Sequence, residues 1–459
     1  MEKRDIQKLL QSQRAFFDSG KTLDVKFRIR MLKKLYAGVK KHQNEINDAL
    51  KADLGKSHFE GFMCETGLSL TEISYLIRHT KRFAKRKLVY TPVAQFASVS
   101  YKQKSPYGNT LIMSPWNYPF LLAIEPVADA IAAGNTAVVK PSAYSPHTSK
   151  VIERIISEIF PREYVAVVTG GRKENACLLE EKFDFVFFTG SQNVGKEVLR
   201  HTAETLTPAV LELGGKSPCI VDESAKISLS AKRIVFGKYL NCGQTCVAPD
   251  FIWCHASIKD RFIEEVKKQI VNQYGESPLT NPDYGKIITE KHFERICSLV
   301  DKDKVVHGGN VNKNTLQIEP TVMDNVTFDD AVMQEEIFGP VMPIITFDNI
   351  EEVIKHQSTL PKPLALYMFS VNRKNINLVT NRLSFGGGCV NDTIIHLATS
   401  QLPFGGVGES GMGAYHGREG FEAFSHTKSI VDKKTWIDLP VRYQPYKKLY
   451  EKMIKLLLR

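Results

Sequence analysis

Cys246 is the residue of this sequence that best suits nucleophilic chemistry. It lies in NCGQTC, after a helical stretch and on a turn that contains glycine. A nucleophilic thiol needs an exposed turn, backbone N–H groups to stabilise an oxyanion, and a base. The alternative is an inert cysteine that packs as a small apolar side chain, the usual role in a large protein. Cys242 lies four residues earlier, a spacing that does not fit the CxxC motif of a redox pair.

A carboxylate and an amide end two predicted strands, where both could assist this thiol. Glu212, in LELGGKSP, ends an apolar strand. Apolar surroundings raise the pKa of a carboxyl group, which suits a general base acting on water. Asn117, in SPWNYP, follows the first strand of the predicted parallel sheet, where open α/β sheets bind ligands, and its amide could donate to an oxyanion. The alternatives are a glutamate that faces solvent and an asparagine that stabilises a turn.

Gly190 and Gly195, in GSQNVGKE, follow the apolar strand FDFVFFT and open a helix. Free N–H groups at a helix N-terminus bind phosphate, so this turn is a candidate nucleotide site. It is not a Walker A loop, because Glu197 replaces the Ser or Thr that holds magnesium. The dinucleotide fingerprint GxGxxG is absent as well. From these residues alone, an ordinary strand-to-helix turn is an equally good interpretation.

Three further turns carry residues of interest. In QEEIFGPV, Glu335 and Glu336 precede Phe338, so a carboxylate and an aromatic ring could bind a ribose and a flat ring. The glycine-rich runs FGGGCVND (385–392) and PFGGVGESGMG (403–413) are expected to be tight functional loops. So many glycines inside a helix or strand would cost stability.

The elements that must position these residues are predicted to be α/β units. From Tyr107 onward, short apolar strands such as TAVV and FVFF alternate with helical stretches, for example at 120–133 and 147–159. This alternation is typical of a parallel sheet with helices on both faces. A second α/β unit is predicted from about Pro208 to residue 400. Residues 25–54 are predicted to form an amphipathic surface helix.

The formal charge of the 459-residue chain is +11, and two short segments account for all of it. Residues 78–88 carry six bases and no acid, and residues 441–459 carry six bases and one acid. A nucleic-acid-binding domain usually spreads its bases along a whole face with aromatics between them, so nucleic acid is not the expected partner. With 43% hydrophobic and 24% charged residues, the chain is expected to be globular, with two or three domains.

The distribution of cysteines indicates the compartment. Eight cysteines are scattered along the chain, and no two form CxxC. A secreted disulfide framework or a zinc site would group them, so we expect reduced thiols and no metal site. The segment MEKRDIQKLLQSQRAFF lacks the apolar core of a signal peptide, and no apolar run has membrane-spanning length. These features favour a cytoplasmic protein.

The C-terminal stretch is predicted to be a basic amphipathic helix. Its apolar residues recur at helical spacing, and four lysines lie on other faces: Tyr446, Leu449, Tyr450, Met453, Ile454 and Leu457, with Lys447, Lys448, Lys452 and Lys455. Such a helix can lie on an anionic membrane surface. Packing on its own protein or on a dimer partner is an equally good interpretation.

Seven motifs occur in order along the chain: PWNYP, VVKPS, FTGSxxxG, LELGGKSP, NCGQTC, EEIFGPV and PFGGVGESGMGxYHGxxGFxxFSH. Together they resemble the aldehyde dehydrogenase superfamily, over roughly Gly108 to His426. The short N-terminus and the segment YHGREGFEAFSHTKS resemble its class 3 branch, which includes fatty-aldehyde dehydrogenases. This order of motifs is far more specific than any single one of them.

The resemblance implies an α/β fold made of a Rossmann-like cofactor domain, an α/β catalytic domain and a small bridging sheet through which homodimers form. The implied ranges are 1–82 and 104–209 for the NAD(P)-binding domain, 210–400 for the catalytic domain, 83–103 and 401–440 for the bridging elements, and 441–459 for the basic helix.

The resemblance also assigns roles. Cys246 matches the nucleophile that forms a thiohemiacetal and then a thioester, Asn117 matches an oxyanion donor together with a backbone N–H of the Cys246 turn, and Glu212 matches the base for deacylation. The positions that match cofactor contacts are Trp116, Lys140, Gly190, Ser191, Gly195, Glu336, which binds ribose, and Phe338, beside the nicotinamide.

One departure concerns the cofactor. After KPS the family commonly has a glutamate that holds the adenosine ribose and would repel a 2′-phosphate, whereas this chain has Ala143. Loss of that carboxylate removes the repulsion. We therefore expect NAD as cofactor, with NADP tolerated.

The expected reaction is the oxidation of a long-chain aliphatic or terpenoid aldehyde, apocarotenoids included, collected near a membrane. A broad-range enzyme for medium-chain or aromatic aldehydes is the second interpretation. A cofactor-free thioester hydrolase would leave the phosphate-type turn and Glu336 unexplained. A nucleotide-binding scaffold without catalysis would not require Cys246, Glu212 and Asn117 together.

Overall fold

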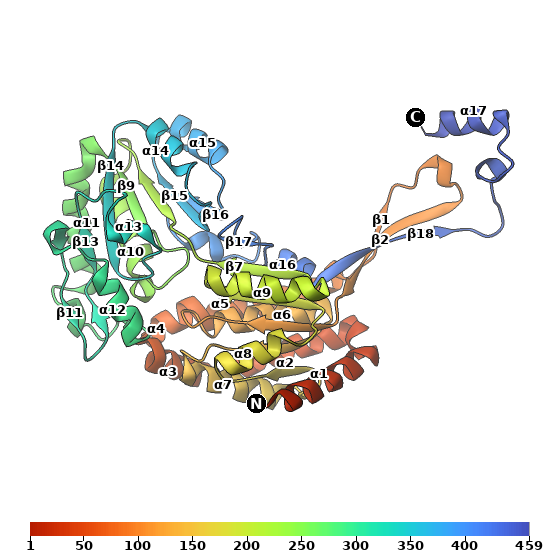
Figure 1. The fold of residues 1–459 in the computed structure, drawn as a ribbon, viewed down its shortest axis with the longest axis horizontal. Helices are drawn as coiled ribbons and strands as arrows, with labels where there is room; N and C mark the ends of the chain where they lie inside the picture. The colour runs from red at the N-terminus through yellow and green to blue at the C-terminus, as the bar shows by residue number, and fades with distance from the viewer. Residues whose placement is uncertain (459) are drawn as a thin grey trace.

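The computed structural model describes residues 1–458, so Arg459, the last residue of the predicted basic helix, lies outside it. Two α/β lobes lie side by side, and an arm extends from the first lobe (Figure 1). The first lobe contains a six-stranded sheet whose strands, in spatial order, are β17 (Gly411–Met412), β7 (Ala209–Leu213), β6 (Phe185–Gly190), β3 (Asn109–Met113), β4 (Thr136–Lys140) and β5 (Val165–Val167). Five of them are parallel, and β17 pairs antiparallel to β7.

The apolar strands of the first sheet are buried on both faces, as their continuous apolar runs predict. Successive side chains point to opposite faces. Leu111 and Phe188 therefore belong to one core, whereas Ile112 and Phe187 belong to the other. Two helical layers cover these faces, which confirms the predicted α/β class.

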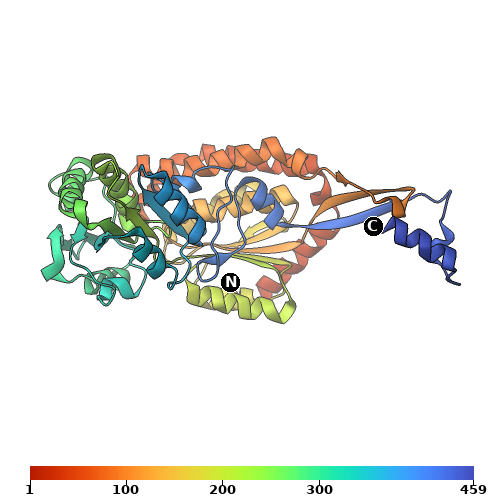
Figure 2. The ribbon, with the colours of Figure 1, turned by 90° about the horizontal axis from the view of Figure 1, so that it is seen from above.

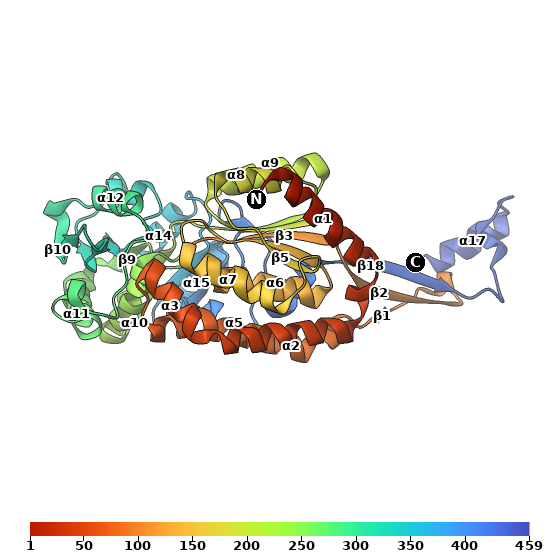
Figure 3. The ribbon, with the colours of Figure 1, turned by 90° about the horizontal axis from the view of Figure 1, so that it is seen from below.

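Helices pack on each face of this sheet (Figure 3). One layer contains α1 (Lys3–Asp18), α8 (Arg172–Leu179) and α9 (Gln192–Thr205). The other contains α2 (Val25–Lys41), α3 (Gln43–Leu54), α5 (Gly67–Phe83), α6 (Leu121–Ala133) and α7 (Pro146–Ile159). Residues 25–54 thus form two helices that break at His42, and the single predicted helix was wrong. The break lets α2 pack on α5 and α6 while α3 packs on α7.

The second lobe contains a seven-stranded sheet in which only β10 is antiparallel. Its spatial order is β10 (Val305–His307), β13 (Thr321–Met323), β14 (Val341–Phe347), β9 (Phe251–His255), β8 (Pro218–Val221), β15 (Ala365–Phe369) and β16 (Gly387–Val390). Its helices are α10 (Ile227–Tyr239), α11 (Lys259–Tyr274), α12 (Glu290–Ser298), α13 (Ala331–Gln334), α14 (Ile350–Gln357) and α15 (Arg373–Arg382). A two-stranded ladder, β11 (Val311–Asn312) with β12 (Gln317–Ile318), lies at its edge.

Part of the glycine-rich run 385–392 is the edge strand β16, so the prediction of a loop there was wrong. The glycines of this run are explained by the backbone of neighbouring segments, which lies too close to leave room for a side chain. A Cβ on Gly388 would lie 2.0 Å from the carbonyl oxygen of Leu366, and one on Gly386 would lie 2.4 Å from that of Gly405. The close approach of these segments excludes larger residues.

The order of strands in the first sheet creates a switch point between β3 and β6. The chain runs outward from β3 through β4 to β5, then returns to β6 and β7 on the other side. Open α/β sheets bind ligands at the carboxyl ends of the strands at such a point. The loop after β3 carries Trp116 and Asn117, and the turn after β6 carries Ser191. Glu212 lies near the end of β7, beside Thr189 of β6.

The arm is an antiparallel three-stranded sheet of β1 (Lys87–Val89), β2 (Ser98–Pro106) and β18 (Ser425–Lys433). Helix α17 (Lys448–Leu457) lies at its far end, away from both lobes (Figure 2). Because β7 continues to Leu213 and β17 joins it, a catalytic range that starts at 210 begins inside the first sheet. Helix α16 (Gly417–Ala423), within the predicted bridging range, packs on α5 and α6 of the first lobe.

Candidate active site

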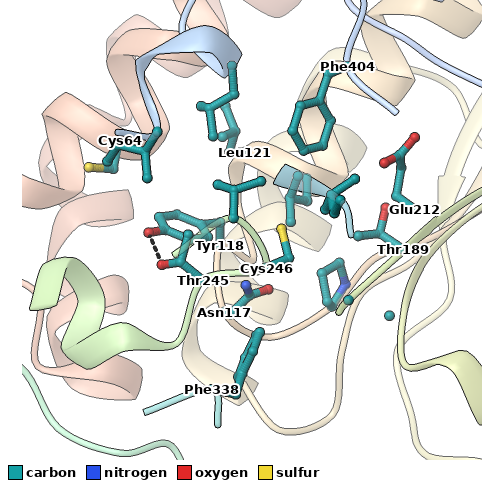
Figure 4. Close-up of a pocket in the computed structure, with 18 of the residues that line it drawn as sticks. Cys64, Asn117, Tyr118, Leu121, Thr189, Glu212, Thr245, Cys246, Phe338 and Phe404 are labelled. Carbon is teal, nitrogen blue, oxygen red and sulfur yellow. Dashed lines mark hydrogen bonds between the residues drawn. The ribbon is translucent and has the colours of Figure 1, made fainter. Parts of the chain in front are cut away.

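One cavity of about 500 Å³ is lined by residues of both lobes, including Thr189 and Glu212 of the first and Phe236 of the second (Figure 4). Eight of the ten predicted site residues line it: Trp116, Asn117, Gly190, Ser191, Glu212, Cys246, Glu336 and Phe338. The structure therefore gathers, around one cavity, side chains that are up to 222 positions apart in the sequence.

Cys246 follows a sharply bent turn. The short helix η4 (Leu240–Gly243) contains three successive left-handed residues, Asn241, Cys242 and Gly243, with φ of 51°, 52° and 71°. Non-glycine residues adopt this conformation at a cost and only where their surroundings enforce it. A Cβ at Gly243 would lie 2.3 Å from the carbonyl oxygen of Gly339, so the turn needs glycine there. The bend directs Cys246 into the cavity (Figure 4).

Gln244 fixes this bend through its side chain. Its amide nitrogen donates to the carbonyl oxygens of Asn241 and Lys286, both at 3.0 Å, and its amide oxygen accepts from the N–H of Ile288 at 3.0 Å. In the residue after Cys246, the carbonyl oxygen of Val247 accepts from the hydroxyl of Tyr367 at 2.5 Å. Hydrogen bonds therefore hold the chain both before and after Cys246.

Burial, together with the nearby carboxyl groups of Glu336 and Glu212, raises the pKa of the Cys246 thiol to about 12. The backbone N–H groups of Cys246 and Val247 act in the opposite direction, because they stabilise a thiolate. At neutral pH the group is thus a thiol, which must lose its proton to react as a nucleophile.

Glu212 is a buried carboxylate with unused hydrogen-bonding capacity. Its side chain is 3% exposed, and neither carboxylate oxygen has a hydrogen-bond partner among residues 1–458. Burial raises the pKa of this carboxyl well above its ordinary value. A carboxylate with a raised pKa and free lone pairs has the properties of a general base.

The Asn117 side chain reaches the Cys246 turn, and its amide nitrogen donates to the carbonyl oxygen of Gln244 at 3.1 Å. Figure 4 shows this amide beside the Cys246 sulfur. The main-chain oxygen of Asn117 accepts from Lys56 Nζ at 3.0 Å and from Asn241 Nδ2 at 2.9 Å. An amide and the backbone N–H of Cys246 can together stabilise an oxyanion at this place.

Glu336 faces the same cavity and can accept a hydrogen bond from a ribose. One of its oxygens, Oε1, has no partner within the described part of the chain. A Cβ at Gly214 would lie 2.2 Å from Oε2, so only glycine permits this approach. Burial raises the pKa of Glu336 to about 8, with Asp250 adding to the rise. The free oxygen fits the ribose contact that the sequence predicts for a nicotinamide nucleotide.

Two cations that the sequence analysis did not single out hold the Glu336 turn. Arg295 donates to Glu335 Oε1 at 2.9 Å and to the carbonyl oxygen of Ile337 at 2.6 Å. Lys216 donates to the carbonyl oxygen of Glu335 at 2.7 Å and to Asp250 Oδ2 at 2.5 Å. Lys216 belongs to the recognised motif LELGGKSP, whereas Arg295 lies in no motif, so only its contacts identify it.

Aromatic side chains form one wall of the nucleotide side. Trp116 makes edge contacts with Phe338 and His292, with ring centroids 5.4 and 5.1 Å apart. Phe338 adopts a left-handed φ of 49°, a strained conformation for an aromatic residue. His292 also lines the cavity, and sequence reasoning missed it because its helix carries no recognisable motif.

Lys140 and Gly195, two of the ten predicted cofactor or catalytic positions, do not line this cavity. Lys140 Nζ instead donates to the carbonyl oxygens of Pro141 and Gly170, at 2.8 and 2.7 Å. Burial lowers the pKa of Lys140 to about 8. Gly195 packs α9 on the sheet, because a Cβ there would lie 2.8 Å from Leu213 Cδ2. The packing of α9 on the sheet explains why residue 195 is a glycine.

The half of the cavity opposite the aromatic wall is mostly apolar, although the ion pair of Glu125 and His416 also lines the cavity. Its lining side chains come from α5, α6, α10 and the C-terminal loops: Leu68, Leu121, Leu122, Phe236, Leu240, Ile394, Leu397 and Phe404, with Met63 from the segment before α5. Apolar pockets with a few convergent polar groups are typical of small-molecule sites. This half suits an aliphatic chain whose reactive end lies at Cys246.

Comparisons with known proteins agree with this geometry. The aldehyde dehydrogenase family model matches residues 1–430. The chain is 46% identical to 4,4′-diaponeurosporen-aldehyde dehydrogenase of Staphylococcus aureus, over 96% of this chain and 97% of the relative. It is 42% identical to the dimeric NADP-preferring aldehyde dehydrogenase of Canis lupus familiaris, over 96% of this chain and 98% of the relative.

Among solved structures, the substrate-bound state of Staphylococcus aureus AldH superposes with a TM-score of 0.97 at 46% identity, and it covers 99% of both chains. The resemblance noted in the sequence is confirmed at the level of the family and of the fold.

Proposed function

The chain belongs to the aldehyde dehydrogenase family and oxidises aldehydes to carboxylates with NAD(P), and we propose that its substrates are long-chain aliphatic or apocarotenoid aldehydes. One observation carries the assignment of the site. A thiol on a bent turn and a buried carboxylate without partners line the same cavity, whose other half is apolar. The name of the Staphylococcus aureus relative, an apocarotenoid-aldehyde dehydrogenase, supports the substrate class.

In the proposed acylation, the Cys246 sulfur adds to the aldehyde carbon and a thiohemiacetal forms. Because burial keeps the thiol protonated, its proton passes to a base as the C–S bond forms. The carbonyl oxygen gains charge in this step. Asn117 Nδ2 and the N–H of Cys246 donate to it, and such donors stabilise the transition state more than the substrate.

When bound, NAD(P) would supply the acceptor for the hydride that leaves the thiohemiacetal carbon. The residues proposed to hold it are Glu336, through its free oxygen, Ser191 at the start of α9, and the ring wall of Trp116 and Phe338. The N-terminus of α9 offers unpaired N–H groups to a phosphate.

Glu212 acts in the proposed deacylation, in which water hydrolyses the thioester. Its free carboxylate oxygens accept a proton from water, and hydroxide adds to the thioester carbon. The C–S bond then breaks, and the proton of the new carboxylic acid passes to the Cys246 thiolate, so that the carboxylate product and the Cys246 thiol result. Thr189, the strand neighbour of Glu212, has a buried hydroxyl oxygen without a partner in the described chain, and it can hold the water beside Glu212.

The proposed tolerance for NADP rests on Ala143, which is exposed and carries no charge. A glutamate at this place would repel a 2′-phosphate, and alanine does not. We expect KM for NADP to lie well within a thousandfold of KM for NAD, as measured by steady-state kinetics with one aldehyde. A larger ratio would contradict the proposal.

We propose in addition that α17 contacts an anionic membrane surface. Its residues Leu449, Met453 and Leu456 form a stripe at helical spacing and are 64%, 41% and 76% exposed. Lys452 flanks this stripe, Lys448 and Lys455 lie further round the helix, and anionic lipid attracts all three lysines. None of the helices within residues 1–458 is long and apolar enough to cross a bilayer.

The protein is also proposed to form a homodimer, as the name of its canine relative suggests.

An aldehyde panel tests the proposed substrate class. Reduction of NAD is followed with aldehydes of increasing chain length, an apocarotenoid aldehyde and benzaldehyde, for the wild type and for Cys246→Ser. The proposal expects kcat/KM to rise with chain length and all reduction to vanish in the variant. A preference for benzaldehyde favours the broad-range interpretation. Esterase activity without reduction favours a hydrolase, and cofactor binding without either reaction favours a scaffold.

Vesicle cosedimentation tests the membrane contact. The full chain and a chain truncated before Val441 are compared on phosphatidylserine-containing vesicles and on neutral phosphatidylcholine vesicles. The proposal expects binding of the full chain to the anionic vesicles only, and its loss on truncation. Equal binding of both chains contradicts the proposal. Loss of the dimer without any effect on vesicle binding favours a role of α17 in the subunit contact.

A further inference from the structure

A buried ion pair lies behind Asn117, outside every motif of the sequence. Lys56 Nζ and Glu65 Oε1 are 2.5 Å apart, and both side chains are almost fully buried, at 1% and 0% exposure. Removing two charges from water is costly, and a buried pair often contributes little net stability. We therefore expect the pair to have a role other than stabilising the fold.

Each member of the pair holds the loop that carries Asn117. Lys56 Nζ donates to the main-chain oxygen of Asn117 at 3.0 Å and lies 3.9 Å from the centroid of the Tyr118 ring. Glu65 Oε2 accepts from the N–H groups of Phe120 and Leu121, at 2.9 and 3.2 Å, where α6 begins. The pair thus fixes the loop on both sides of residues 118 and 119.

The backbone that carries Glu65 is itself unusual. Residues Phe62–Thr66 form a π-helix between α4 (His58–Gly61) and α5. Such wide turns occur mostly at functional sites, because they redirect side chains. Gly67 permits the turn, since a Cβ there would lie 2.7 Å from the carbonyl oxygen of Phe62.

The same loop is joined to the Cys246 turn. Tyr118 and Thr245 share a hydrogen bond between their hydroxyl groups at 2.7 Å (Figure 4). Asn241 Nδ2 donates both to the oxygen of Asn117, at 2.9 Å, and to that of Gln244, at 3.1 Å. A displacement of the Asn117 loop would therefore change the distance between the Asn117 amide and the sulfur.

We propose that Lys56 and Glu65 are positioning residues, which hold the Asn117 amide at the distance from Cys246 that oxyanion stabilisation requires. This inference rests on the proposed role of Asn117. A misplacement of about 1 Å at a reacting group costs on the order of 100-fold in rate. Removal of a whole oxyanion donor costs about 100- to 1000-fold.

The test is a double-mutant cycle between the pair and Asn117. Lys56→Met/Glu65→Gln removes both charges and the donor to Asn117, but keeps an acceptor for the N–H groups of α6. We expect kcat/KM to fall about 10- to 100-fold in the otherwise wild-type chain. In an Asn117→Ala background, the same substitutions should cost less than about threefold, because the amide they position is gone.

A purely structural role gives a different result. The pair substitutions would then lower kcat/KM by the same factor in both backgrounds, and this additivity would overturn the inference. Full activity of the Lys56/Glu65 variant would overturn it as well. Full activity of Asn117→Ala alone would instead contradict the proposed role of Asn117. If the pair variant does not fold, Glu65→Gln replaces it in the cycle.

A matched control removes another ion pair far from the cavity. Lys259 Nζ and Asp324 Oδ2 are 2.9 Å apart, and neither residue lines the cavity. Lys259→Met/Asp324→Asn should leave kcat/KM and KM for NAD unchanged. The Lys56/Glu65 variant should likewise leave the Kd for NAD unchanged, measured by fluorescence quenching, because its residues do not contact the nucleotide side.

Discussion

The catalytic cavity differs from the arm of β1, β2, β18 and α17 in how its side chains are held. Around Cys246, most polar side-chain groups of the turn have defined partners, and Gln244 alone makes three hydrogen bonds. The exception is the buried Asn241 Oδ1, which has no partner among residues 1–458. In the arm, Leu88, Tyr90 and Trp436 are 71%, 80% and 71% exposed. Their large apolar surfaces contact few other residues of the chain.

The difference separates two kinds of function. A buried turn held by many hydrogen bonds specifies one geometry, so substitutions there change a rate while the fold persists. An exposed apolar surface gains its energy only when something else covers it, so substitutions there change association while catalysis persists. The predictions below test whether the two regions are independent in this way.

The largest effect is expected for Glu212→Gln in the cavity. The amide cannot accept a proton from water, so kcat should fall about 100- to 10,000-fold. Acylation should still occur, so stopped-flow absorbance should show a burst of about one NADH per active site. A variant that turns over at the wild-type rate would exclude Glu212 as the base.

The same variant should not be destabilised, which provides a control for folding. Burial raises the pKa of Glu212 in the folded state above its ordinary value of 4.5, so ionisation at higher pH weakens the fold. The neutral amide removes this penalty, and no hydrogen bond within the described chain is lost. Tm at pH 8 should equal or exceed that of the wild type. A marked fall in Tm would show that the carboxylate has a structural partner.

The reactivity of Cys246 should depend on pH over an unusually high range. Burial holds its pKa at about 12 in the absence of cofactor, compared with an ordinary 9.0. The thiolate fraction should therefore rise about tenfold for each pH unit between 7 and 10. Alkylation of the Cys246 peptide by iodoacetamide, followed by mass spectrometry, measures this rate. A plateau of the alkylation rate near pH 9 would show that the thiol is not desolvated. The half-buried Cys177 serves as the internal reference.

Local sequence was sufficient for some parts of the site and insufficient for others. Cys246, Glu212 and Asn117 lie at the ends of strands or on turns, where glycine, proline and apolar runs indicate the geometry. Lys56 lies 61 residues from the oxygen that it contacts. No periodicity or spacing links two such positions, because the fold alone brings them together.

Backbone proximity was the other source of error. The glycines of 385–392 indicate conformational freedom when only the sequence is considered, yet Gly388 is there because the Leu366 backbone leaves no room for a side chain. Gly195 is also closely packed, in this case against the Leu213 side chain, and its predicted contact with the cofactor stays a prediction. Glycine alone does not reveal which of these reasons applies.

A smaller effect is expected for Glu336→Gln, on the nucleotide side of the cavity. Above pH 8 the Glu336 carboxyl is mostly ionised, and under these conditions the amide, which can still donate or accept, loses the charge-assisted bond to a ribose hydroxyl. We expect KM for NAD to rise about 10- to 30-fold, in line with 1.5 to 2 kcal/mol for such a bond, and kcat to fall less than threefold. Initial-rate kinetics at saturating aldehyde give both constants. A loss confined to kcat would place Glu336 near the reacting atoms instead.

The smallest effect on catalysis, and the one that isolates the arm, is expected for Leu449→Asp. Burying a leucine in an apolar environment is worth about 1.5 to 3 kcal/mol, so binding to anionic vesicles should weaken at least tenfold. Because Leu449 is 64% exposed, the unfolding free energy should change by less than about 0.5 kcal/mol, and kcat with a short water-soluble aldehyde should not change. Leu206→Asp is the matched control, since Leu206 is 89% exposed but lies at the end of α9, outside the arm. If both variants bind vesicles equally well, the apolar stripe of α17 does not contact lipid.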